Sequence, residues 1–98
     1  MDPVRQMVPL AGRTLYTLGQ QRGFDVLTVD PGRSVAVVLR VHSSGKLREV
    51  TRRDIEAGFA LAQRLPRGTL GAKRLRDEQA CQANPAYLAT LLREIGAN

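Results

Sequence analysis

The residues with the clearest chemical capacity in this sequence are basic, and they are concentrated in its middle. Ten of the fifteen lysines and arginines lie between positions 40 and 76, against three acidic residues, and thirteen of the fifteen are arginine. The planar guanidinium group binds phosphate or guanine through two parallel hydrogen bonds. A basic stripe of this kind is expected of a nucleic-acid-binding protein. The candidate contact residues are Arg40, Lys46, Arg48, Arg52, Arg53, Lys73, Arg74 and Arg76.

Few aromatic residues accompany these basic ones, which bears on the form of nucleic acid. Only Tyr16 and Phe24 are candidates to stand on a sheet and stack on bases. Base stacking is the usual way to hold single strands. The sequence therefore favours duplex DNA, bound by a small accessory or regulatory domain.

Two other interpretations of the basic stripe remain open. Arginine-rich composition can reflect nothing more than a solvated face. Alternatively, the chain is a protein-interaction module, such as a small phage or host regulator or inhibitor, that docks an acidic partner or forms a homodimer. A sheet edge and the leucine-rich last helix would then supply the contact surface.

The residues that could support catalysis are isolated from one another. His42 is the only histidine and Cys81 the only cysteine, and no neighbouring motif supplies a base or a nucleophile. One histidine and one cysteine cannot form a typical zinc site, and no glycine-rich phosphate loop occurs. Asp77 and Glu78 are adjacent, so on a helix they point in different directions. We expect no enzymatic activity, no metal and no cofactor.

Cysteine content and hydropathy bear on the compartment. A single cysteine cannot form an internal disulfide, which favours a reducing cytoplasm. The first residues lack the pattern of a signal peptide, and no apolar run approaches membrane-spanning length.

The element that positions most of the basic residues is predicted between residues 35 and 65. Residues 35–41 alternate with a period of two, so their odd positions would face a core. A two-residue turn at Ser44 and Gly45 would lead into a return strand over residues 47–50 and place Arg40 opposite Glu49. Thr51 then resembles the first residue of a capping box, ahead of an amphipathic helix.

The segments before this element contain further strands. Residues 1–9 carry two prolines and are predicted to be an extended lead-in. Residues 13–18 favour a strand, with a short helix as the alternative. Residues 24–30 form a strand that could be buried on both faces. Asp30, Pro31 and Gly32 then form a turn.

Two helices are predicted after the central element. Thr69 is the expected cap of a short helix over residues 70–80, and Asn84 with Pro85 begins a final helix that ends at Gly96. The fold class is therefore α+β: one domain over residues 1–98, with an antiparallel meander of three or four strands over residues 14–51 and three helices over residues 52–98. The expected core is Val37, Leu39, Ile55, Phe59, Leu88, Leu91 and Leu92.

Overall fold

The fold is a four-stranded antiparallel meander followed by three helices, as the sequence predicts. A computed structural model describes residues 2–17, 19, 21–81 and 83–98. The strands are β1 (Thr14–Tyr16), β2 (Gly23–Val29), β3 (Val35–Val41) and β4 (Leu47–Thr51), hydrogen-bonded in the order β1-β2-β3-β4. The helices that follow are α2 (Arg52–Arg64), α3 (Ala72–Asp77) and α4 (Pro85–Glu94). The α+β class is confirmed, and residues 14–16 form a strand rather than a helix.

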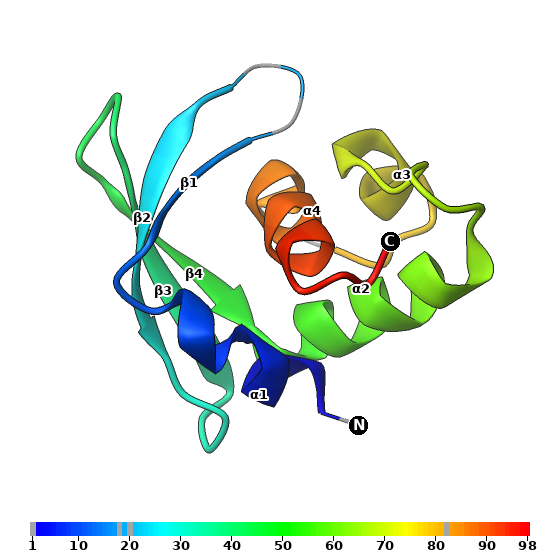
Figure 1. Cartoon of the computed structure of the whole chain (residues 1–98), viewed down its shortest axis with the longest axis horizontal. Helices are drawn as coiled ribbons and strands as arrows, with labels where there is room; N and C mark the ends of the chain where they lie inside the picture. Colours follow the sequence, from blue (N-terminus) through cyan, green and yellow to red (C-terminus); the bar gives the residue numbers. More distant parts are fainter. Residues whose placement is uncertain (1, 18, 20, 82) are drawn as a thin grey trace.

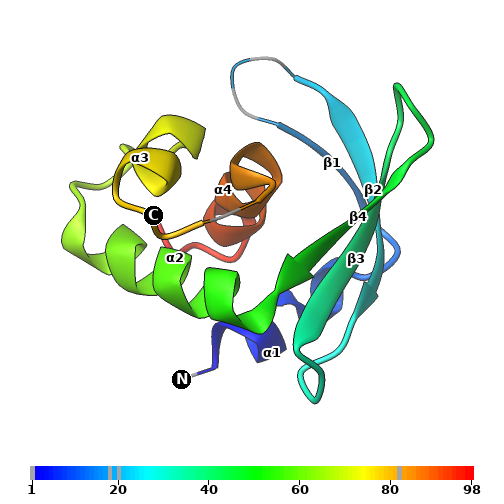
Figure 2. The same cartoon turned by 180° about the vertical axis from the view of Figure 1, so that it is seen from behind.

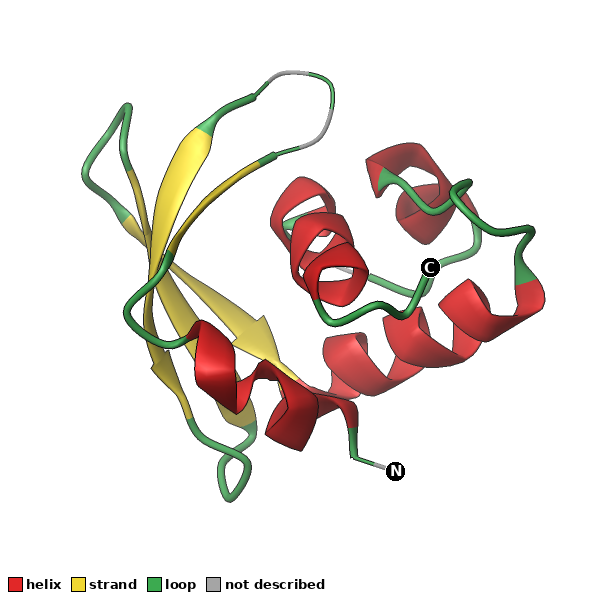
Figure 3. Ribbon diagram, in the orientation of Figure 1, coloured by secondary structure: helices red, strands yellow, loops and turns green. Residues whose placement is uncertain are grey.

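All the helices of the described chain lie on one face of the sheet (Figures 1 and 3). The view from behind shows the same arrangement, with the opposite face of the sheet bare (Figure 2). Alternation along the strands explains this, because β2 buries Phe24 and Val26 while Asp25 and Leu27 stay partly exposed. The two-faced burial expected for residues 24–30 is therefore wrong.

The core lies between the sheet and the helices. Strand residues Val37 and Leu39 are fully buried there, as are Leu88, Leu91 and Leu92 of α4. Phe24 of β2 meets Tyr87 of α4 edge to face, with ring centroids 5.1 Å apart. Aromatic pairs prefer this geometry, and it fixes α4 against the sheet.

Phe59 is the exception among the expected core residues, because it is only partly buried. The buried stripe of α2 runs instead through Ile55, Gly58, Leu61 and Ala62. Phe59 lies one position from Gly58, which turns it by about 100° around the helix axis. It therefore packs at the margin of the core.

The N-terminal residues form helices and are not an extended lead-in. Helix α1 spans Pro3–Met7, and a 3₁₀ turn, η1, spans Val8–Leu10. Asp2 caps α1 by accepting a hydrogen bond of 3.0 Å from the backbone N–H of Val4. Proline is well suited to the first turn of a helix, where its missing N–H has no partner to lose.

The β3–β4 turn is longer than predicted, and this shifts the register. Val41 and Lys46 are joined by a backbone hydrogen bond of 2.9 Å, so residues 42–45 form a four-residue loop with Gly45 at φ 68°. Arg40 consequently faces Leu47 and Glu49 faces Val38. The predicted pairing of Arg40 with Glu49 is wrong.

Two predicted helix caps also differ in the structure. Helix α3 begins after Gly71, because the Leu70 N–H donates to the Asn98 side chain at 2.9 Å and the Thr69 hydroxyl donates to the Pro66 carbonyl. Asn84 does precede α4, but it adopts left-handed geometry at φ 59° and makes no capping hydrogen bond. Its amide donates instead to the Glu49 carbonyl of β4, at 3.0 Å. Asn84 thus joins the start of α4 to an edge of the sheet.

Candidate nucleic-acid interface

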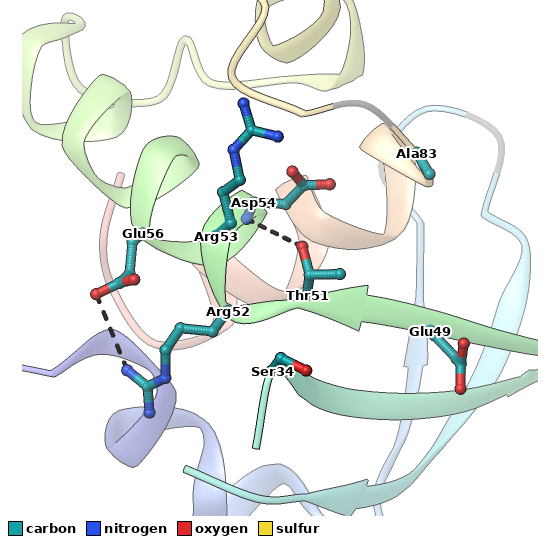
Figure 4. Close-up of a pocket in the computed structure, with 8 residues that line it drawn as sticks. All are labelled: Ser34, Glu49, Thr51, Arg52, Arg53, Asp54, Glu56 and Ala83. Carbon is teal, nitrogen blue, oxygen red and sulfur yellow. Dashed lines mark hydrogen bonds and ion pairs between the residues drawn. The ribbon is translucent and has the colours of Figure 1, made fainter. Parts of the chain in front are cut away.

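The start of α2 separates two arginines that are adjacent in the sequence. The Thr51 hydroxyl accepts a hydrogen bond from the Asp54 N–H at 3.2 Å, which confirms Thr51 as the cap of α2. Successive residues of a helix point about 100° apart. Figure 4 shows the result, with the side chains of Arg52 and Arg53 directed away from each other.

Arg52 is held inside the fold. Its two terminal nitrogens bind the two carboxylate oxygens of Asp2 at 3.1 and 3.3 Å, and one of them also donates to the Pro31 carbonyl. This hydrogen bonding from Arg52 holds the pKa of the Asp2 carboxyl below its usual value. With 27% of its side chain exposed, Arg52 connects α1 to α2 and has little charge to offer a ligand.

Arg53 is exposed and lines two adjoining hollows. The first, of about 700 Å³, is the one in Figure 4, and its acidic residues are Glu49, Asp54 and Glu56. The second, of about 380 Å³, is lined by Arg53, Arg76, Gln79 and Cys81. Arg53 therefore belongs both to a hollow of mixed charge and to one whose described lining contains no acidic residue.

A third hollow shares Arg76 with the second and includes an arginine that is not among the predicted contact residues. It measures about 330 Å³, and Arg76 belongs to its lining as well as to that of the second hollow. Arg22, from the β1–β2 connection, lines it beside Thr17, Asn84 and Tyr87. No sequence signal indicates Arg22, because only the packing of α3 and α4 beside this connection brings it near Arg76. We call the second and third hollows, with Arg22, Arg53 and Arg76, the arginine groove.

The three groove arginines form no ion pair within the described part of the chain. The ion pairs there use Arg5, Arg13, Arg33, Arg52 and His42. The Asp54 carboxylate, from the lining of the first hollow, lies 3.7 Å from the Cys81 sulfur. Unpaired guanidinium groups around a hollow attract an anion and can bind phosphate through charge-assisted hydrogen bonds.

The remaining predicted contact residues lie outside the groove. Lys73 and Arg74 lie on α3 between Ala72 and Arg76. Ala72 and Arg76 are one helical turn apart and both line the third hollow, so the side chains of Lys73 and Arg74 point away from it. Arg40 is on the bare face of the sheet, beside Asp25. Lys46 is exposed next to the β3–β4 loop, and Arg48 is exposed on β4, on the same face as the buried Val50. The eight residues thus do not form one surface, and two of them, Arg53 and Arg76, share the groove.

The Cys81 thiol has low reactivity in this setting. Burial, followed by the charge of Asp54, raises the pKa of its thiol to about 11. A thiol with such a pKa is almost entirely protonated at neutral pH and is a poor nucleophile. No cluster of three metal-ligating side chains occurs among the described residues.

Comparison with known proteins gives no match. The chain matches no protein-family model, no characterised protein and no solved structure. In the described residues, no helix has the length and apolar character needed to span a bilayer.

Proposed function

We propose that this protein binds nucleic acid, with duplex DNA as the favoured form, and that the arginine groove contacts the phosphate backbone. The observation that carries the proposal is that Arg53 and Arg76, from different helices, line one hollow and form no ion pair within the described part of the chain. Arg22 continues the positive lining into the adjoining hollow. Phosphate contacts by such residues bind nucleic acid with little regard to sequence.

Docking of an acidic protein partner, or formation of a homodimer, is the second candidate. The bare face of the sheet favours it, since Tyr16 and Leu47 are exposed there. The last helix does not, because its leucines at positions 88, 91 and 92 are buried inside the fold. The sheet edge at β4 is also partly occupied, by the hydrogen bond from Asn84 to Glu49.

The test is a titration of labelled duplex DNA, followed by fluorescence anisotropy, at several salt concentrations. The double variant Arg53→Ala with Arg76→Ala should bind more weakly than the wild type to every sequence. Each lost phosphate contact reduces the magnitude of the logarithmic salt slope by about one. The slope of the double variant should therefore be smaller in magnitude by about two.

The matched control is Arg64→Ala with Arg67→Ala, which makes the same change in net charge. Both residues are exposed near the C-terminal end of α2, and Arg67 lines a separate hollow there. This variant should keep a salt slope close to that of the wild type. Equal loss in both double variants would contradict the groove, and no binding at low salt would contradict nucleic-acid binding altogether.

A further inference from the structure

The bare face of the sheet carries two rings side by side over one glycine. On β1 and β2, Tyr16 is opposite Gly23, and the His42 N–H donates to the Gly23 carbonyl at 3.0 Å from the other side. Side chains of strand residues alternate between the two faces. Because Leu15, Phe24 and Val41 point into the core, Tyr16 and His42 point outward.

Gly23 has no side chain, and both rings occupy the space that one would fill. A Cβ atom at this position would lie 2.5 Å from His42 Nδ1 and 3.1 Å from a ring carbon of Tyr16. Any other residue at position 23 would therefore push the rings away from the backbone. Glycine brings the phenol and the imidazole together above the sheet.

The imidazole is held in position by polar contacts on the same face. Nε2 of His42 is 2.9 Å from Asp25 Oδ1, and the Thr14 hydroxyl donates to the same oxygen at 2.6 Å. These hydrogen bonds, led by that from His42, lower the pKa of Asp25. Arg40 is paired with Asp25 in the register of β2 and β3, so a cation stands beside the rings.

Both rings remain open to solvent. Tyr16 is 59% exposed, and the side chain of His42 is 42% exposed. Exposed aromatic rings on an open sheet are the usual surface on which unpaired bases stack, and a nearby cation accommodates the phosphate. The small aromatic content of the sequence argues against stacking, but the second ring here is supplied by a histidine.

We propose that Tyr16 and His42 form a stacking platform for an unpaired nucleobase, with Arg40 beside it for the adjoining phosphate. The proposal rests on nucleic-acid binding by the arginine groove and adds a second site, for unpaired bases. The two sites are close along the chain, because Thr17 and Arg22, which line the groove, form the hydrogen-bonded pair next to Tyr16 and Gly23.

A protein partner suits this face less well than an unpaired nucleobase does. Large apolar side chains that are mostly exposed on it are limited, within the described chain, to Tyr16 and Leu47. A stable protein interface buries about 800 Å² on each side around an apolar centre. Two rings with a flanking arginine match the size and chemistry of one or two bases instead.

The experiment compares a labelled oligothymidylate with an abasic strand of the same length, which has the same phosphates but no bases. The wild type should bind the oligothymidylate more tightly than the abasic strand. Tyr16→Leu keeps an apolar strand residue but removes the ring, so it should weaken oligothymidylate binding by about 5- to 100-fold and leave abasic binding unchanged. Tyr16→Phe, the matched control, keeps the ring and should bind as the wild type does.

The outcomes separate this proposal from the groove. Equal wild-type affinity for both strands, or a folded Tyr16→Leu protein that binds oligothymidylate like the wild type, would overturn the platform. If the Arg53 and Arg76 double variant still loses affinity in that case, binding by the arginine groove is supported without the platform. Absence of binding to either strand at low salt would overturn the platform, and the duplex titration then tests the groove separately.

Discussion

At the scale of single residues, whether an arginine can bind a ligand depends less on its charge than on the contacts that it already makes in the folded protein. Arg52 and Arg53 are adjacent, yet one binds both carboxylate oxygens of Asp2 and the other lines an open hollow. An arginine already paired in the folded protein must break that pairing before it can bind phosphate. Substitution of Arg52 would consequently disturb the contact between α1 and α2, and it is unsuitable as a test of ligand binding.

Cys81 offers a residue-scale prediction about reactivity. Its pKa is raised from 9.0 to about 11, which lowers the thiolate fraction at pH 8 by about 100-fold. We expect iodoacetamide to alkylate the native protein at least about 100-fold more slowly than the urea-unfolded chain. Mass spectrometry of timed samples measures both rates. Comparable rates in the two states would show that the thiol is neither buried nor shielded by Asp54.

At the scale of elements, the contact between α2 and α4 depends on Gly58. A Cβ atom there would lie 3.0 Å from a Leu92 methyl, 3.2 Å from one of Leu88 and 3.3 Å from one of Leu75. Gly58→Val should therefore lower the free energy of unfolding by about 1–3 kcal/mol through overpacking. The control is Ala57→Val on the exposed side of α2, which should cost less than about 1 kcal/mol. Urea unfolding measures both, and equal losses would contradict the close packing of α2 on α4.

The sequence predicts elements where a periodic pattern ends at a clear local signal. The alternation of residues 35–41, the Thr51 cap and the stripe of Leu88, Leu91 and Leu92 all identify their elements correctly. The predicted register of β3 and β4 is wrong, because Gly45 suits the end of a two-residue loop and of a four-residue loop equally well. Backbone hydrogen bonds decide between the two loops. The sequence does not predict the helix at Pro3–Met7, although Asp2 and Pro3 are a start signal, because so short a helix is stabilised only by tertiary contacts.

The candidate site was less predictable than the fold. Arg53 and Arg76 could be chosen from the basic stripe, but their convergence depends on how α3 folds back beside the start of α2. Arg22 is outside that stripe, and the stacking surface of Tyr16 and His42 requires Gly23 between them. Such groupings arise from tertiary packing and sheet pairing, which a charge pattern along the chain does not contain.

At the scale of the whole molecule, helix α1 closes the core. Val4 and Met7 are fully buried, and α1 lies between the sheet and α2 in Figure 1, in contact with α2. The ion pair between Asp2 and Arg52 joins the beginning of α1 to the beginning of α2. The N-terminal residues therefore belong to the same cooperative unit as the sheet and the later helices.

This role predicts a large difference between two neighbouring substitutions. Met7→Ala removes a fully buried side chain and leaves a cavity, so it should lower the free energy of unfolding by about 2–5 kcal/mol. Val8→Ala is the matched control, because Val8 is 43% exposed and its truncation should cost less than about 1 kcal/mol. A small domain has only about 5–15 kcal/mol of stability, so Met7→Ala should lower Tm by many degrees in thermal unfolding followed by circular dichroism. Equal Tm values for the two variants would mean that α1 is not part of the core, and that residues 2–10 behave as the extended lead-in that their prolines first indicate.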